Sequence, residues 1–370
     1  MTAGTRTHAR ANVERLEVAA YKIPTEKPES DGTLEWDSTT LVVVELASEG
    51  LRAVGYTYAN VATAKLVEEK LAPIVRGSDA MQIEATWGKM VAAIRNLGRG
   101  GITSMAIAAV DTALWDLKAR LLDLPLYQLL GAPRDRVPLY GSGGFTSYSI
   151  EELQRQLAGW VGSGIPRVKM KVGRDPENDV KRVNAARNAI GNDAKLFVDA
   201  NGAYCVKQAI EFSRRFAELD VSWYEEPVYH RDIAGNRIVR EHVPPSMEVS
   251  NGEYGYSPHD FVELIDGGAC DVLQGDVTRC EGITGFLMAD ALCTARNIPF
   301  STHCAPAITA HPAAAAKQLR HLEYFHDHVR IEEMLFEGLP PIRQGEFDLT
   351  SSGPGNGLIF NRRIAEQFKQ

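Results

Sequence analysis

Ionisable side chains recur in the second half of the chain, each directly after a short apolar run. Two lysines, Lys169 and Lys171, come first, in the alternating run 167–172. Six further groups follow at steps of 26, 28, 23, 27 and 20 residues, and they are Asp199, Glu225, Glu253, Asp276, His303 and Glu323. Each step is about the length of one strand–helix unit. A single acid after a strand is often only the N-cap of the next helix, but so regular a series indicates side chains gathered around one site.

The two lysines share one face of their strand, because side chains alternate along a strand. Val168, Met170 and Val172 share the other face. On an exposed edge strand the lysines would point to solvent. In a barrel covered by helices the apolar face packs outward and both lysines point inward, where anions must offset their charge. We expect repulsion between the two ammonium groups to lower the pKa of one or both, which suits a lysine that acts as a base.

Three of the carboxylates can supply those anions. Asp199, Glu225 and Glu253 offer only oxygen ligands, and hard oxygen ligands favour Mg²⁺ over zinc or copper. Glu226 would point to the opposite side if its strand continues, so Glu225 is assigned as the ligand. The sequence therefore predicts one Mg²⁺ site, and the alternative is that these acids are ordinary helix caps and surface residues.

A histidine at a strand end is more often structural than catalytic. His303, however, follows a strand whose predecessor ends in Asp276. An Asp–His pair fixes the tautomer of the imidazole and raises its basicity. This pair is the candidate for acid–base chemistry, and the other histidines of the chain lack such a partner.

These side chains need a framework that brings strand ends together. From about Val137, eight apolar runs alternate with helical stretches, and the runs are 138–144, 167–172, 195–200, 222–227, 247–253, 270–276, 298–303 and 320–325. Strand–helix alternation implies a parallel sheet, and eight strands can close into a barrel with its functional residues at their carboxyl ends. We predict an α/β fold with a modified TIM barrel, (β/α)7β, and a doubly wound open sheet is the alternative.

The segments on either side of the barrel complete the predicted organisation. Apolar patterning predicts strands at 13–23, 40–46 and 52–58 and helices at 60–76, 79–95 and 101–122. The predicted units are an N-terminal α+β capping domain over 12–136, the catalytic barrel over 137–330 and a C-terminal segment over 331–370 that packs back on the capping domain. Residues 1–11 are expected to be a leader.

Composition narrows the possible partners. The chain has 370 residues, 44% of them hydrophobic, and a net charge of −8, which argues against nucleic acid and other polyphosphates. The apolar runs are too short to cross a membrane, and the N-terminus has no apolar core typical of a secretory signal. The five cysteines form no CxxC pair. We expect a cytoplasmic homo-oligomer that acts on a small-molecule carboxylate.

Taken in order, these motifs resemble the enolase superfamily and, within it, the mandelate racemase subgroup. The matching segments are Lys169 to Lys171, Asp199 to Asn201, Trp223 to Pro227, Asn251 to Glu253, Asp276 with Arg279 and Gly282 to Gly285, His303, Glu323, and Ala113 to Asp116 in the first domain. The muconate cycloisomerase and dipeptide epimerase subgroups carry a lysine where this chain has Asp276. The resemblance covers nearly the whole chain and therefore favours the mandelate racemase subgroup.

The resemblance implies removal of a proton α to a carboxylate, with the resulting charge stabilised by Mg²⁺ and by Lys169. Lys171 and His303, oriented by Asp276, would be the two acid–base groups. Glu323, if protonated, would donate a hydrogen bond to the second carboxylate oxygen. The substrate-binding residues implied by the resemblance are Asn201, Trp36 and Arg279.

Two acid–base groups allow either epimerisation or loss of a β-hydroxyl to give a 2-keto acid. The segment 22–39, expected to be a loop that closes over the site, is dense in charged and hydroxyl groups. It suits a C5–C6 hydroxylated acid better than a phenyl ring, with Glu35 and Asp37 among its expected contacts. We predict an acid-sugar dehydratase. A racemase or epimerase, another lyase or cycloisomerase, and a non-catalytic metal-binding barrel are the alternatives.

Overall fold

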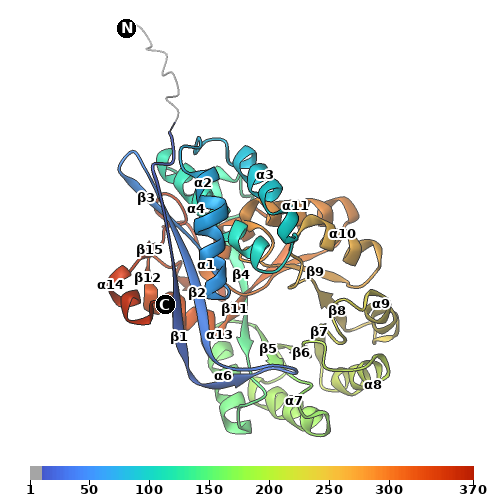
Figure 1. The fold of residues 1–370 in the computed structure, drawn as a ribbon. Helices are drawn as coiled ribbons and strands as arrows, with labels where there is room; N and C mark the ends of the chain where they lie inside the picture. The colour runs from blue at the N-terminus through green and yellow to red at the C-terminus, as the bar shows by residue number, and fades with distance from the viewer. Residues whose placement is uncertain (1–10) are drawn as a thin grey trace.

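A closed barrel of eight parallel strands forms the larger part of the molecule (Figure 1). The computed structural model describes residues 11–370, so the predicted leader lies outside the described residues except for Ala11, which is buried. The barrel strands are β4 (Arg136–Gly143), β5 (Arg167–Lys171), β6 (Lys195–Asp199), β7 (Val221–Glu225), β8 (Glu248–Asn251), β9 (Val272–Gly275), β10 (Phe300–Thr302) and β11 (Leu319–Phe325). Strand β11 pairs with β4 and closes the sheet. The predicted barrel is confirmed, and the open-sheet alternative is excluded.

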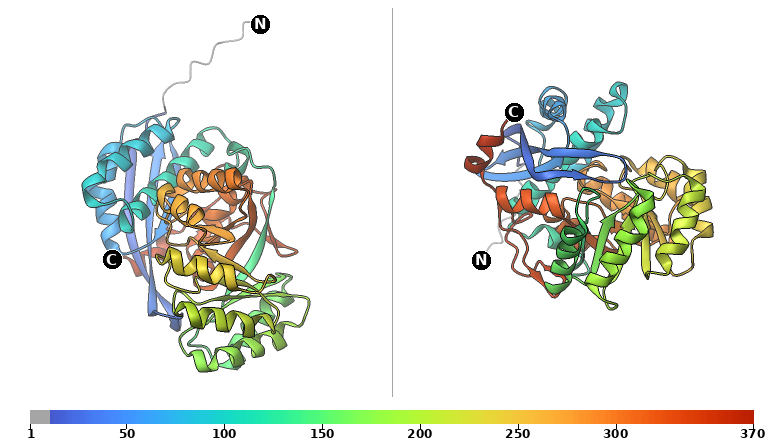
Figure 2. Two further views of the ribbon diagram at one scale, coloured as in Figure 1. Left: turned by 90° about the vertical axis from the view of Figure 1, so that its right-hand side faces the viewer. Right: turned by 90° about the horizontal axis from the view of Figure 1, so that it is seen from below.

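One helix follows each of the first seven strands. These helices are α6 (Ile150–Gly162), α7 (Pro176–Ile190), α8 (Val206–Ala217), α9 (Ile233–His242), α10 (Pro258–Asp266), α11 (Gly282–Arg296) and α12 (Pro306–Ala315). They surround the sheet, as the two turned views show (Figure 2). The outward face of β5 explains the arrangement: Val168 and Met170 are fully buried in a cluster with Leu153 of α6 and Val183 of α7. The apolar half of each strand is thus covered by helices, and the other half faces the barrel interior.

The N-terminal part is an antiparallel sheet covered by helices. Its strands are β1 (Arg15–Ser30), β2 (Glu35–Ser48) and β3 (Leu51–Tyr58), and its helices are α1 (Val61–Leu66), α2 (Ala72–Val75), α3 (Ile83–Ala93) and α4 (Ile102–Leu121). A π-helical turn, Val67–Leu71, joins α1 to α2 within the predicted helix 60–76. Most residues of α4 are buried, because it packs on the sheet and also on α11 of the barrel.

The prediction of a loop over 22–39 is wrong. Strands β1 and β2 extend through most of this segment as a long hairpin, with only residues 31–34 left as the turn. A register shift between Pro24 and Glu29 bends the hairpin. Its far end rests on the barrel, where Glu29 and Ser30 are buried. The polar composition suggested an irregular loop. The contacts that order this segment come from distant parts of the chain, so the local sequence does not reveal them.

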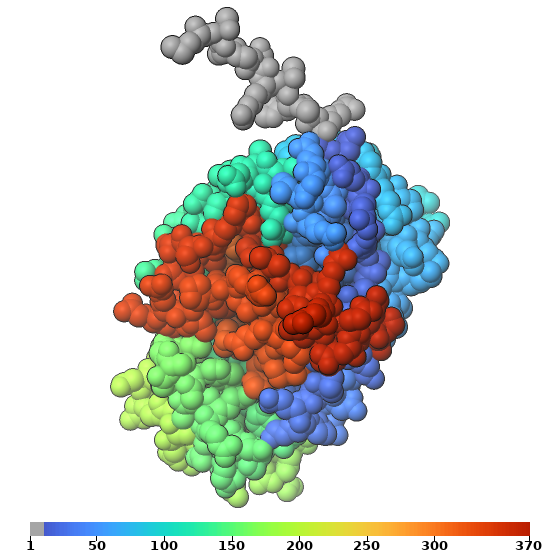
Figure 3. Space-filling model, turned by 90° about the vertical axis from the view of Figure 1, so that its left-hand side faces the viewer, coloured from blue at the N-terminus to red at the C-terminus, as the bar shows by residue number. Residues whose placement is uncertain are grey.

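The C-terminal segment contacts both other parts of the molecule. Helix α13 (His326–Leu335) and the chain after it place Leu335, Phe336 and Leu358 in one core cluster with Tyr56 of β3. Strand β14 (Glu346–Asp348) pairs antiparallel with β4 of the barrel. Figure 3 shows this segment in red between the blue capping sheet and the green start of the barrel. Across the described residues, no helix is both long and apolar enough to cross a membrane.

Candidate active site

The barrel interior is built in layers. An aromatic floor consists of Tyr140, Phe197 and Trp223, with ring centroids of the last two 5.3 Å apart. The next inward position of the same strands is two residues further on. On β6 and β7 these positions hold Asp199 and Glu225, both fully buried. The charged side chains therefore lie above an apolar floor, where water cannot screen them.

The two lysines of β5 point into this interior and pair with carboxylates. Lys169 Nζ contacts Glu225, lies 2.8 Å from Glu323 Oε1 and lies 3.5 Å from Asp199 Oδ2. Lys171 Nζ lies 2.5 Å from Asp199 Oδ2. Both lysines are buried. Four strands of the barrel thus supply one network of opposite charges.

The prediction that repulsion lowers the pKa of Lys169 or Lys171 is wrong beside these carboxylates. Burial lowers the pKa of Lys169, but the charges of Glu225 and Glu323 raise it more, so its pKa lies well above the usual value. Burial and the charge of Lys169 lower the pKa of Lys171, but the charge of Asp199 raises it, and the net result is a pKa above the usual value. The sequence showed the two like charges side by side, but it did not show how close the carboxylates of neighbouring strands come.

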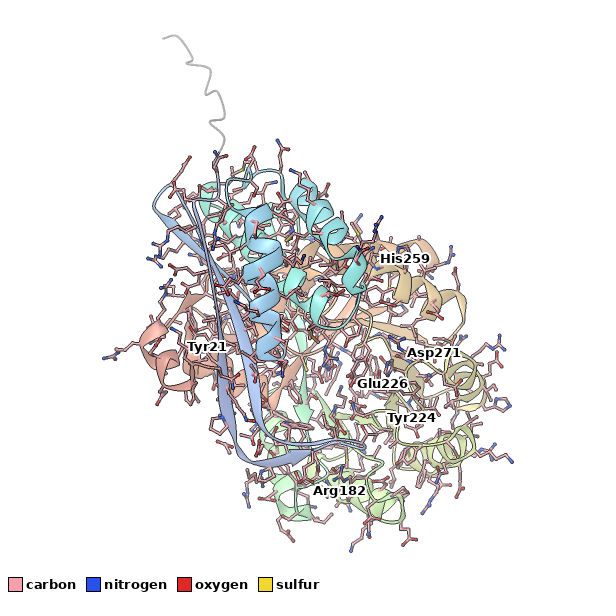
Figure 4. All side chains as sticks on the ribbon, viewed as in Figure 1. Tyr21, Arg182, Tyr224, Glu226, His259 and Asp271 are labelled. Carbon is pink, nitrogen blue, oxygen red and sulfur yellow. The ribbon has the colours of Figure 1, made fainter. Side chains whose placement is uncertain are left out.

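Two glutamates at the same end of the barrel keep oxygens without partners. Glu253 Oε1 lies 3.3 Å from Arg279 Nη1, whereas Glu253 Oε2 accepts no hydrogen bond from the described residues. Glu226, labelled in Figure 4 beside Tyr224, is buried, and its Oε1 is also unpartnered among residues 11–370. Burial and the neighbouring charges of Glu253 and Asp199 raise the pKa of Glu226 well above its usual value. This end of the barrel therefore has more carboxylate charge than its own cations neutralise.

His303 and Asp276 form the predicted pair. The Nδ1 atom of His303 lies 2.7 Å from Asp276 Oδ2, and Asp276 Oδ1 accepts two hydrogen bonds from Thr278. Burial raises the pKa of Asp276, but the hydrogen bond with His303 and the charge of Arg279 lower it below the usual range. Asp276 is thus ionised and holds the proton of His303 on Nδ1, which leaves Nε2 facing the cavity.

Glu323 differs from its predicted role as a hydrogen-bond donor. Its Oε1 pairs with Lys169 and its Oε2 accepts a hydrogen bond of 2.7 Å from the backbone N of Cys304. Burial raises the pKa of Glu323, but Lys169 and His303 lower it well below the usual value. The carboxylate is therefore ionised and accepts hydrogen bonds, because the lysine that the family motif places on β5 reaches it directly.

The hairpin of the capping domain closes the cavity above these groups. The cavity has a volume of about 400 Å³, within the usual range for a small-molecule site. From the barrel it is lined by Lys171, Asn201, Glu253, Tyr254, Asp276, Arg279, His303 and Cys304, and from the hairpin by Asp31, Leu34, Trp36, Ser38, Thr39 and Thr40. Trp36 is fixed by a hydrogen bond of 3.0 Å to Glu29 and an edge contact with Phe145.

The hairpin residues that line this cavity differ from those expected. Glu35 does not line it and pairs instead with Arg174, 3.2 Å away, on the exposed side of the hairpin. Asp37 does not line it either, and its carboxylate accepts a hydrogen bond from the Ser38 hydroxyl. Glu35 and Asp37, expected to contact the substrate, therefore do not line this cavity. Trp36 and Ser38, which alternate with Glu35 and Asp37 along the strand, line the cavity instead.

Comparison with known proteins agrees with this geometry. Residues 17–131 match the mandelate racemase/muconate lactonizing enzyme N-terminal domain, and residues 152–364 match the enolase C-terminal domain-like family. This chain belongs to the mandelate racemase/muconate lactonizing enzyme family of the enolase superfamily. The predicted family and fold are confirmed, with an eight-stranded parallel barrel and an N-terminal antiparallel capping sheet.

Three relatives illustrate the range of this family. A mandelate racemase/muconate lactonizing enzyme-like protein from Rubrobacter xylanophilus is 51% identical, with a TM-score of 0.95 over 97% of this chain and 100% of its own. The 3,6-anhydro-alpha-L-galactonate cycloisomerase of Streptomyces coelicolor is 34% identical over 84% of this chain and 88% of its own. L-talarate/galactarate dehydratase of Salmonella typhimurium is 30% identical over 87% of this chain and 84% of its own. Its structure liganded with Mg and L-lyxarohydroxamate has a TM-score of 0.89 at 27% identity, over 100% of this chain and 96% of its own.

The carboxylate cluster fits a hard dication. Oxygens of Asp199, Glu225 and Glu253 lie within 4.8 Å of one another, and all three side chains are buried. The unpartnered Oε2 of Glu253 is the kind of buried anionic atom that a cation satisfies. Only carboxylate oxygens are offered, which suits Mg²⁺. The three residues therefore form a candidate site for Mg²⁺.

Several residues of the site escaped the sequence analysis. Gln274 donates a hydrogen bond of 3.0 Å to Glu225 Oε2, and Trp223 donates one of 2.9 Å to the same atom. Each lies two positions before a strand-end acid, so alternation along β9 and β7 could have identified both. Cys304 and Tyr254 also line the cavity. No pattern in the sequence distinguishes them from other loop residues.

The tip of the hairpin provides a test of closure. A Cβ added at Gly32 would collide with the carbonyl oxygen of Ala200 and lie 2.7 Å from that of Val172, both at barrel strand ends. We expect Gly32→Ala to hold the hairpin off the barrel and lower kcat/KM by roughly 10- to 100-fold, because small misplacements of binding groups are costly. Gly159→Ala on α6, where a Cβ meets nothing within 4 Å, is the matched control. Equal kinetic constants in both variants would contradict closure by this contact.

Proposed function

We propose that this chain is an acid-sugar dehydratase that removes the proton α to a carboxylate and expels the β-hydroxyl, giving a 2-keto-3-deoxy acid. The observation that carries the proposal is one cavity in which Lys171 and His303 lie below a surface of hydroxyl and aromatic groups, Ser38, Thr39 and Trp36. Buried substrate hydroxyls need partners, since an unpaired one costs about 1–3 kcal/mol. The Ser38 and Thr39 hydroxyls already donate to Asp37 and Asp327, so each oxygen is left to accept a hydrogen bond from a substrate hydroxyl, which an aryl ring does not offer.

Each residue of the site has a separate role in the proposed dehydration. Lys171 takes the α-proton, and Lys169 stabilises the negative charge that develops on the substrate carboxylate. His303 donates a proton to the leaving β-hydroxyl, which departs as water, and the resulting enol becomes the 2-keto acid. Asp276 stabilises the charged imidazole. Mg²⁺ held by Asp199, Glu225 and Glu253 would act as a Lewis acid towards the substrate carboxylate.

The ion pairs seen here must rearrange before Lys171 can act. Its ammonium group lies 2.5 Å from Asp199 Oδ2. When Asp199 serves as a metal ligand, its charge is shared with the cation, and Lys171 is less strongly held. Glu323 keeps its contact with Lys169 and positions that ammonium group, so its proposed role is positioning rather than proton donation.

A panel of aldonic and aldaric acids of C5–C6 length, incubated with the Mg²⁺-loaded protein, tests the proposal. Formation of a 2-keto acid, detected with semicarbazide, is the expected result. Deuterium incorporation from D₂O without a keto product would favour a racemase or epimerase. The cycloisomerase from Streptomyces coelicolor supports a second candidate function, and conversion of an anhydro-sugar acid faster than any open-chain acid would favour it. Turnover of mandelate above all sugar acids would refute the dehydratase.

A further inference from the structure

A thiol lies directly beside the proposed acid of this site. The Sγ atom of Cys304 is 3.2 Å from His303 Nε2, and Glu323 Oε2 is 4.0 Å from the same nitrogen. The three side chains are buried, and one ligand atom of each lies within 4.8 Å of the other two. A sulfur, a nitrogen and an oxygen thus converge on one point at the edge of the cavity.

The backbone fixes this arrangement. Cys304 and Ala305 both have positive φ values, 48° and 43°, and form the sharp turn between β10 and α12. The backbone N of Cys304 is hydrogen-bonded to Glu323 and that of Ala305 to His328 Nδ1, at 3.1 Å. The turn therefore directs the Cys304 side chain towards the imidazole without needing any ligand.

The tautomer of His303 leaves its Nε2 atom available to bind a metal ion. Asp276 binds His303 at Nδ1, so the lone pair of Nε2 faces the thiol. Carboxylate–histidine pairs of this kind orient the imidazole of many zinc sites. Glu323 uses Oε1 for Lys169, and its Oε2 accepts one hydrogen bond from the backbone N of Cys304, which leaves the second lone pair of Oε2 for a metal ion.

We propose that His303, Cys304 and Glu323 form a second metal site, distinct from the all-carboxylate cluster, that takes Zn²⁺ or a similar thiophilic dication. Ligand atoms around tetrahedral zinc lie roughly 3.3–3.7 Å apart, given bond lengths of about 2.0–2.3 Å. The observed 3.2 and 4.0 Å require movements of a few tenths of an ångström. The Cys304 thiol loses its proton on binding, so a thiolate and a carboxylate balance the ion. The fourth position is open to the cavity.

Occupation of this site has one consequence for turnover, which rests on the proposed function. The ion takes the lone pair of His303 Nε2, so His303 can no longer carry the proton for the leaving hydroxyl. Zn²⁺ should therefore inhibit in the presence of saturating Mg²⁺, and substrate should compete with it because both occupy the same cavity.

Cobalt spectroscopy tests the site without reference to turnover. Co²⁺ added to the Mg²⁺-saturated protein should give the near-ultraviolet charge-transfer band of a cobalt–thiolate bond, and Zn²⁺ should remove it. Cys304→Ser should abolish the band. Cys205→Ser, which removes an exposed cysteine, is the matched control and should leave it unchanged. No band in the native protein, or a band that persists in Cys304→Ser, would overturn the proposal.

A second variant guards against misfolding. His303→Asn removes the nitrogen ligand and should weaken Co²⁺ binding at least roughly tenfold, with its thermal unfolding monitored alongside. Unaltered Co²⁺ affinity in a folded His303→Asn protein would overturn the proposed site. If the band appears as expected but Zn²⁺ does not inhibit the dehydration, the metal site stands and the role given to His303 in turnover fails.

Discussion

Replacement of Lys171 by alanine or of His303 by asparagine is expected to lower kcat about 10²–10⁴-fold, the usual effect of losing a general acid or base. Both groups line the same cavity, and each acts on a proton that water transfers poorly in a closed site. Asp276→Asn should have a milder or equal effect, because it acts through the tautomer and charge of His303. Steady-state kinetics on the best acid of the panel provides the measurement.

The matched controls lie on the outer helices of the barrel. Lys181 on α7 and His259 on α10 are both exposed, and only His259 is labelled in Figure 4. Lys181→Ala and His259→Asn should keep native rates. Lys171→Ala should still exchange the α-proton of one substrate epimer through His303, which proton NMR in D₂O detects. Native rates in both Lys171→Ala and His303→Asn would refute the two-base assignment.

Removal of the divalent cation is expected to abolish turnover, and added Mg²⁺ should restore it. Burial, together with the charges of Asp199, Glu323 and Glu253, raises the pKa of Glu225 well above its usual value although Lys169 lowers it, so a cation between the carboxylates favours the ionised form of Glu225. Glu253→Gln removes one ligand charge and should weaken Mg²⁺ binding in calorimetry, with a corresponding loss of rate at low Mg²⁺.

Glu248, on the strand β8 that precedes Glu253, provides the comparison. It lies at the other end of β8, is partly exposed and contacts Arg320, so Glu248→Gln should bind Mg²⁺ as the native protein does. Full activity after exhaustive treatment with EDTA, or equal Mg²⁺ affinity in the two variants, would refute the metal assignment.

The sequence alone determined the framework and the identity of the charged groups. Alternation in the run 167–172 separated Lys169 and Lys171 from the apolar residues that pack against helices, because period two is intrinsic to a strand. The regular steps from Asp199 to Glu323 predicted acids at successive strand ends, because each step is one strand and its helix. Both properties depend on residues close together in the chain, so they can be recognised from the sequence alone.

Only the tertiary structure decided how those groups meet. It showed that Glu323 binds Lys169 and is ionised, that the carboxylates raise the lysine pKa values, and that the polar segment 22–39 is a hairpin whose Gly32 rests against Ala200. Each of these depends on distances between residues far apart in the chain. Electrostatic effects vary steeply with such distances and with burial, and neither is contained in the spacing of residues along the sequence.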